Sequence, residues 1–134
     1  MKKIVLIVCC GILFLALSSC TSYELVVPVG IWQSDDPSIT LDIANDVSDP
    51  NFGTYVRDGE EIEIYIVFGH VSNLLSIYDA IVLNENHKGG WDDWTYFVGN
   101  WDIKDDKLYL ILKSKWREMH GIDKIVFTKI ADYE

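Results

Sequence analysis

Three runs of the chain place an apolar residue at every second position, which is the period of a β-strand with one buried face. The apolar positions are Ile39, Leu41 and Ile43, then Ile62, Ile64, Ile66 and Phe68, and finally Leu108, Leu110 and Leu112. Residue types that favour strands (Val, Ile, Tyr, Phe, Trp and Thr) supply 44 of the 115 residues after position 19, whereas alanine supplies three. The sequence therefore predicts a mostly β domain in which helix is a minor component.

Eight strands account for these runs and for the apolar segments between them. We expect them near residues 30–34, 38–44, 53–57, 61–69, 76–84, 94–103, 107–115 and 123–130. Their short spacing predicts an antiparallel meander, with a tight hairpin at Asp58-Gly59 and an open loop over 84–93. Closing the sheet removes its exposed edges, so we expect an all-β, eight-stranded barrel, with a β-sandwich as the alternative. The bulky inward side chains predict little or no internal cavity.

The first 19 residues differ in character from the rest of the chain. Lys2 and Lys3 precede an apolar run from Ile4 to Leu17, and this stretch has no acidic residue. A basic start, a short apolar run and a small-residue exit predict a secretory signal peptide, because the run is too short to span a bilayer comfortably. We therefore expect residues 1–19 to be a signal peptide, 20–28 a tether and 29–134 the folded domain.

The segment Leu17-Ser18-Ser19-Cys20 resembles the lipobox of bacterial lipoproteins, in which an aliphatic and two small residues precede a lipidated cysteine. The resemblance implies that Cys20 carries acyl chains such as palmitate, which attach the protein to a membrane. A conventional signal peptide followed by a free cysteine is the alternative. Cys20 is the only cysteine left after cleavage, so it cannot form a disulfide within the chain. Because a free thiol is a liability in an oxidising compartment, this favours lipidation of Cys20. Thr21 is not the aspartate that retains some lipoproteins in the inner membrane, so we expect the outer membrane or cell surface.

Two further segments carry a family resemblance. Gly30-Ile31-Trp32 resembles the Gly-x-Trp signature of lipocalins, and residues 105–110 with 124–130 are similar to the ending of small bacterial lipocalin-like lipoproteins. The resemblance implies a barrel in which Trp32 plugs the closed end. It also implies that a basic residue of the last strand, Lys124 or Lys129, lies over the indole. Because one fold supports many activities, this likeness bears on the fold more than on the function.

Patterns of catalytic or metal-binding residues are not evident. The sequence has no Gly-x-Ser-x-Gly elbow, and His70, His87 and His120 fall at strand ends or in loops without the spacing of a zinc site. The acidic pairs Asp35-Asp36, Asp92-Asp93 and Asp105-Asp106 lie in turn segments, where carboxylates cap turns. A calcium loop would need more oxygen ligands at regular spacing. We expect no enzymatic activity, no metal and no cofactor.

An aromatic cluster is the strongest candidate for a binding site. Trp91, Trp94, Tyr96, Phe97 and Trp101 fall within eleven residues, and Trp116 follows the next strand. Strand alternation puts Trp94 and Tyr96 on one face and Phe97 and Trp101 on the other. One interpretation is that Trp91, Trp94 and Trp116 form a platform for a sugar ring or an apolar ligand. The other is that these rings cap the end of a small barrel.

The net charge of the chain after the signal peptide argues against one class of partner, nucleic acid. From Cys20 onward the chain has nine basic and 21 acidic residues, a formal charge of −12, which would repel nucleic acid. We expect a monomeric lipoprotein of the cell envelope with a binding or interaction role. A carrier of a small lipophilic ligand or glycan is one alternative, and an inhibitor or other domain that binds an envelope protein is another.

Overall fold

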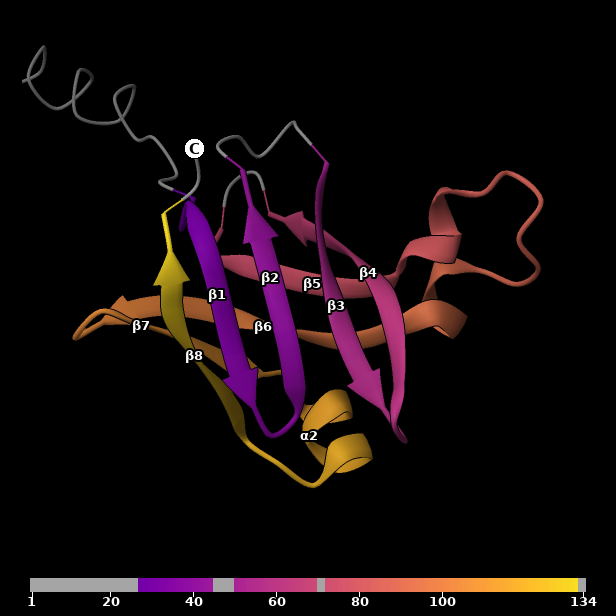
Figure 1. Cartoon of the computed structure of the whole chain (residues 1–134). Coiled ribbons are helices and arrows are strands. Elements are labelled where there is room, and N and C mark those ends of the chain that lie inside the picture. Colours follow the sequence, from indigo (N-terminus) through magenta and orange to yellow (C-terminus); the bar gives the residue numbers. More distant parts are fainter. Residues whose placement is uncertain (1–26, 45–49, 70–71, 133–134) are drawn as a thin grey trace, which may run out of the picture.

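The computed structural model describes residues 27–44, 50–69 and 72–132, which form a closed antiparallel barrel (Figure 1). Its strands are β1 (Gly30–Asp35), β2 (Ser38–Ile43), β3 (Asn51–Arg57), β4 (Glu60–Phe68), β5 (Leu74–Asp79), β6 (Thr95–Lys104), β7 (Lys107–Leu112) and β8 (Lys124–Ala131). The short helices are η1 (Ala80–Leu83), η2 (Trp91–Trp94) and α2 (Ser114–His120).

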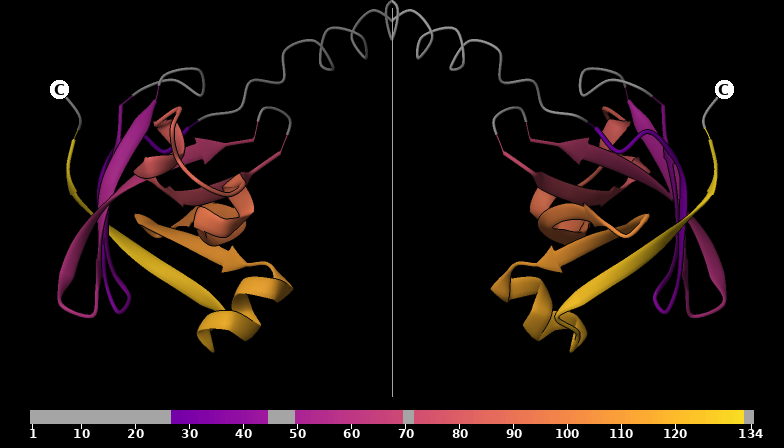
Figure 2. Two further views of the ribbon diagram at one scale, coloured as in Figure 1. Left: turned by 90° about the vertical axis from the view of Figure 1, so that its right-hand side faces the viewer. Right: turned by 90° about the vertical axis from the view of Figure 1, so that its left-hand side faces the viewer.

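Each strand pairs with the next in sequence, and β1 pairs with β8 to close the sheet. All of these pairings are antiparallel. The predicted eight-stranded meander is therefore confirmed, and the fold is a barrel rather than a sandwich. The views in Figure 2 show the strands wrapping around one interior.

Two predicted strands end earlier than expected, because short helices follow them. The strand predicted over 76–84 stops at Asp79, whose Oδ1 accepts a hydrogen bond of 2.9 Å from the Ile81 amide and so caps η1. The strand predicted over 107–115 stops at Leu112, and α2 begins at Ser114. Gly121 ends this helix with a left-handed φ of 69° and donates its amide to the Arg117 carbonyl.

Bulky apolar side chains occupy the barrel interior. In the described part of the chain, the core comprises Trp32, Ile39, Leu41, Ile43, Tyr55, Ile64, Ile66, Phe68, Leu75, Ile77, Phe97, Leu108, Leu110, Leu112, Ile125 and Phe127. Each of these side chains is at most 8% exposed. Ile62, which the alternation also predicts to point inward, is only half-buried near the turn between β3 and β4.

The two ends of the barrel differ. β1 starts and β8 finishes at the same end, which is uppermost in Figure 1 and which we call the Trp32 end. The opposite end, here the α2 end, carries α2 beside the turns that join β1 to β2 and β3 to β4. The connection between β5 and β6 contains η1 and η2 and projects from the side of the barrel.

Among the described residues, no helix has both the length and the apolar character needed to cross a bilayer.

Candidate functional site

Trp32 is buried at the end of the barrel where β1 begins. Its side chain is 3% exposed, and its Nε1 donates a hydrogen bond of 2.9 Å to the Pro28 carbonyl. Lys129 places its Nζ 5.9 Å from the centre of the indole ring, whereas Lys124 lies over Tyr109 instead. A Cβ on Gly30 would come within 2.6 Å of Lys129 Cε, so glycine at this position lets the lysine stem pass over the ring. These contacts make Trp32 part of the core.

The three tryptophans of the predicted platform have three different surroundings. Trp91 is 44% exposed on the outside of the barrel. Trp94 is half-buried and donates its Nε1 to the Lys88 carbonyl at 2.8 Å, which fixes the loop between η1 and η2. Trp116 packs against the core from α2, and its buried Nε1 has no acceptor among the described residues. Of the three, Trp91 is the ring most available to a ligand.

Trp91 belongs to an aromatic row that sequence reasoning missed. Phe52 is the cross-strand partner of Tyr65, and Tyr65 is the partner of Tyr78, so the three rings lie side by side on β3, β4 and β5. Trp91 packs edge-on against Tyr65 and Tyr78, with ring centres 6.2 and 5.1 Å apart. Of these residues, the predicted alternation gives an outward position only to Tyr65, and the strand register makes Phe52, Tyr65 and Tyr78 neighbours.

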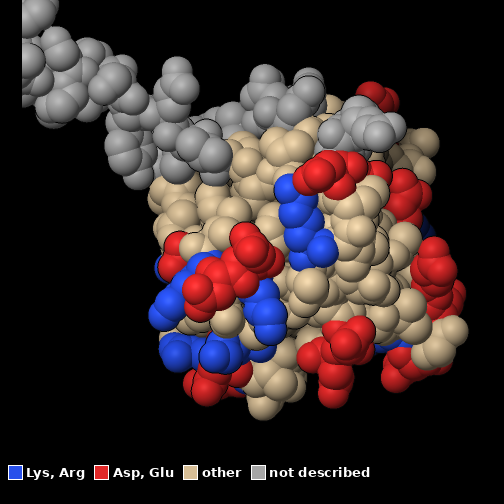
Figure 3. All heavy atoms as spheres, turned by 60° about the vertical axis from the view of Figure 1, so that its left-hand side comes forward, with Lys and Arg blue, Asp and Glu red and all other residues tan. Residues whose placement is uncertain are grey.

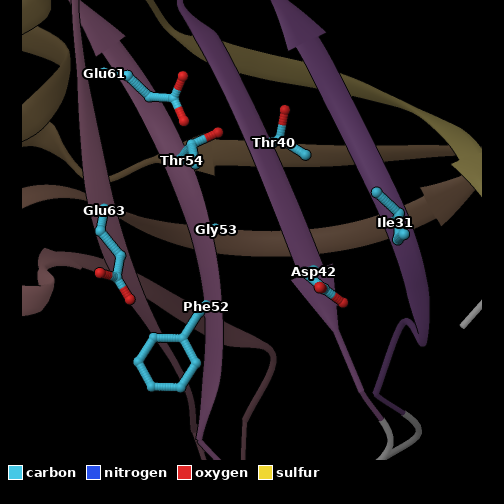
Figure 4. A pocket seen from close by; sticks show the side chains of 8 residues that line it. All are labelled: Ile31, Thr40, Asp42, Phe52, Gly53, Thr54, Glu61 and Glu63. Carbon is cyan, nitrogen blue, oxygen red and sulfur yellow. The ribbon is translucent and has the colours of Figure 1, made fainter.

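A recess lies beside this row on the outer surface of β1 to β4. Its volume is about 610 Å³, and we call it the outer groove. It is lined by Ile31, Thr40, Asp42, Phe52, Gly53, Thr54, Glu61 and Glu63, and Figure 4 shows these residues on four neighbouring strands. Phe52 joins the groove to the aromatic row, because its ring centre is 5.8 Å from that of Tyr65. None of the lining residues was singled out as a site from sequence.

A second recess lies at the α2 end and has a volume of about 370 Å³. The hydroxyl of Tyr96, one of its lining residues, donates to Asp79 Oδ2 at 2.7 Å. Burial, reinforced by this bond to a carboxylate, raises the pKa of Tyr96 to about 12. Burial also raises the pKa of Tyr55, which packs edge-on against Tyr96. Both phenols therefore stay protonated near neutral pH, and the Tyr96 hydroxyl acts as a hydrogen-bond donor.

His120 connects α2 to β6 through two side-chain contacts at this recess. Its ring stacks on Phe97 with centres 4.3 Å apart, and its Nε2 lies 2.7 Å from the Tyr96 carbonyl. Because a carbonyl oxygen only accepts hydrogen bonds, Nε2 carries the proton in this contact. His120 therefore has a packing role that holds the helix over the end of the barrel.

The histidines, acidic residues and cysteine considered in the sequence analysis do not form a common site among the described residues. His87 contacts the Asn84 carbonyl through Nδ1 at 2.6 Å, and His70 lies outside the described residues. Asp105 and Asp106 adopt left-handed backbone angles in the turn between β6 and β7. Within the described ranges, no three His, Cys, Asp or Glu side chains come together as ligands for a metal ion. Cys20 and the rest of the lipobox also lie outside the described residues.

Fold and surface together define a small closed β-barrel module with a bulky apolar interior and recesses on its outside. No family model, no curated protein and no solved structure matches the chain.

Proposed function

We propose that the protein is a bacterial lipoprotein that Cys20 anchors to an envelope membrane, and that its barrel is a binding or interaction module. The observation that carries the binding role is the contrast between interior and exterior. The interior is occupied by bulky side chains, whereas the outside carries an aromatic row that runs from the 44% exposed Trp91 to Phe52, and Phe52 lines a recess of about 610 Å³. Recesses of this size are typical of small-molecule sites.

The anchor is supported by the sequence and by where the barrel starts. The lipobox ends at Cys20, and β1 starts at Gly30. Ten residues of extended chain span at most about 35 Å, so a lipid on Cys20 would keep the barrel close to the membrane surface. The barrel also supports the resemblance to small lipocalin-like lipoproteins.

Among the alternatives, the surface favours recognition on the outside of the barrel over transport inside it. A carrier of a lipophilic ligand encloses that ligand in an apolar cavity. Here the side chains that face the interior are large and at most 8% exposed. The exposed ring of Trp91 and the groove next to its row suit a glycan or another flat ligand.

Substitution of Cys20 tests the anchor. In the native host, we expect the wild-type chain to incorporate labelled palmitate and to partition into detergent. Cys20→Ala should give a released protein or an uncleaved precursor without label. Cys10→Ala is the matched control, because it removes a cysteine inside the signal peptide and should behave as wild type. A Cys20→Ala protein that is cleaved and still held on the membrane would refute the lipoprotein proposal.

A further inference from the structure

We propose that the outer groove binds an oligosaccharide that carries free amino groups. This inference rests on the proposed binding role of the barrel, but it does not depend on the lipid anchor.

The cross-strand register brings carboxylates and hydroxyls together in the groove. Thr40 pairs with Thr54, and Thr54 pairs with Glu63, so these side chains form one polar row across β2, β3 and β4. Glu61 and Asp42 add two more carboxylates to the lining. Figure 4 shows these polar groups along the recess, with the ring of Phe52 at one end. The groove thus offers several hydrogen-bond acceptors next to an apolar surface.

The charge of this side of the barrel is not offset by cations. The described residues of β1 to β4 and their turns, 30–44 and 50–68, contain seven acidic residues and one basic residue, Arg57. The Arg57 guanidinium lies 4.0 Å from the Asp58 carboxylate in the turn at the α2 end, and none of the described lysines and arginines lines the groove. Residues 100–132, by contrast, contain seven basic and six acidic residues. Figure 3 brings forward the left-hand side of Figure 1, where β7 and β8 lie, and shows basic side chains next to acidic ones on that face. The groove therefore favours a cationic ligand and repels phosphates and acidic sugars.

The aromatic row argues for a sugar among the possible cations. A sugar ring has a flat apolar face of C–H groups, and such a face packs well on the faces of aromatic side chains. Phe52 supplies a ring inside the groove, and Tyr65, Tyr78 and Trp91 extend the aromatic surface beyond it. A protonated amine gains further from nearby rings and carboxylates. An amino sugar combines the apolar face, the hydroxyls and the positive charge that these residues can recognise.

Matched oligosaccharides allow a direct test by titration calorimetry of the full-length chain in a non-ionic detergent. The probes are a glucosamine hexamer, the N-acetylglucosamine hexamer, which has the same sugar rings without the charge, and hexalysine, which has charge without sugar. We expect the glucosamine hexamer to bind at least about tenfold more tightly than either of the others. Its affinity should fall as salt is added, because exposed ion pairs are screened.

Variants locate the binding to the groove. Glu61 and Glu63 are exposed, so Glu61→Gln with Glu63→Gln should keep the fold, which the melting temperature checks. We expect this double variant to bind the glucosamine hexamer about tenfold more weakly, since two partly exposed ion pairs are lost. Glu118→Gln, an exposed carboxylate on α2, is the control and should bind as wild type. Phe52→Leu should weaken the glucosamine hexamer but leave hexalysine unchanged.

Several results would overturn the proposal. They are equal affinity for the two sugars, hexalysine binding as tightly as the glucosamine hexamer, no binding of either sugar, and full affinity in the double glutamine variant. Equal or tighter binding of hexalysine would point to a basic peptide instead. None of these results bears on the Cys20→Ala experiment, so the groove and the anchor can fail separately.

Discussion

Gly30 shows how a single absent side chain shapes the Trp32 end of the barrel. Its φ of 138° and the 2.6 Å approach of Lys129 both disfavour any other residue. The lysine stem that passes here brings its charge over the Trp32 ring, and the indole in turn donates to the Pro28 carbonyl. Lys129 of the last strand thus packs against the local contact between Trp32 and Pro28 at the entry to β1.

Trp32 should be a major source of stability. Trp32→Ala removes a side chain that is 3% exposed and leaves a cavity together with a carbonyl that has lost its donor. We expect a loss of about 3–5 kcal/mol in the free energy of unfolding, measured by urea denaturation in detergent. A loss below about 1 kcal/mol would mean that the ring contributes little to the core.

The Tyr96 phenol should lose its proton at a higher pH than an ordinary tyrosine. Its pKa of about 12 reflects burial first and then the bond to Asp79, so the phenol should ionise well above the usual value of 10 in a spectrophotometric titration. Because the folded state holds the proton more tightly than the unfolded state, stability should fall as pH rises from about 10 to about 12.

Asp79→Asn is the companion variant for this titration. It removes the carboxylate charge but keeps an oxygen acceptor, so the Tyr96 pKa should move down towards 10. An unchanged Tyr96 pKa in this variant would assign the whole shift to burial.

At the scale of elements, the stability of α2 depends on Gly121, the residue that ends the helix. Gly121 has a left-handed φ of 69°, and a Cβ there would meet no atom within 4 Å. Gly121→Ala should therefore cost about 1 kcal/mol through backbone strain alone. Gly90 offers the same open space at a φ of −87°, so Gly90→Ala should be nearly neutral. Thermal unfolding of the two variants measures the difference, and equal melting temperatures would contradict this account.

The strands could be predicted from the sequence because alternation is a local signal. Ile39, Leu41, Leu108 and Leu110 are buried as their spacing indicates. The short helices could not be predicted in the same way. The apolar segment Ala80–Leu83 resembles a strand, but it forms η1, which the Asp79 side chain caps.

α2 and the outer groove escaped prediction because both depend on distant contacts. The helix is seven residues long and exposes most of its side chains, and it is held by Trp116 against the core and by His120 on Phe97. The groove depends on register, since Thr40, Thr54 and Glu63 become neighbours only when three strands pair. A sequence specifies which face a residue occupies more readily than which residue stands beside it.

For the whole molecule, the side chains of the stabilising core lie inside the barrel, whereas the proposed binding surface lies on its outside. Phe97 is fully buried and Trp91 is 44% exposed, although only five residues separate them. Phe97→Ala should cost about 3–5 kcal/mol, whereas Trp91→Ala, which loses two edge contacts on the surface, should cost about 1 kcal/mol. Urea unfolding midpoints test the contrast. Similar losses in the two variants would show that the aromatic row is part of the structural core.

The pairing of β1 with β8 would have a particular consequence if the proposed lipid anchor holds the protein on a membrane. Anchored molecules diffuse in two dimensions and meet one another far more often than they would in free solution. A sheet with an open edge would then offer unpaired backbone groups to each neighbour and invite strand-to-strand polymerisation. In this barrel the first and last strands satisfy one another, so its hydrogen-bonding ladder presents no free edge to other copies. Dense packing on a membrane is therefore compatible with copies that stay separate.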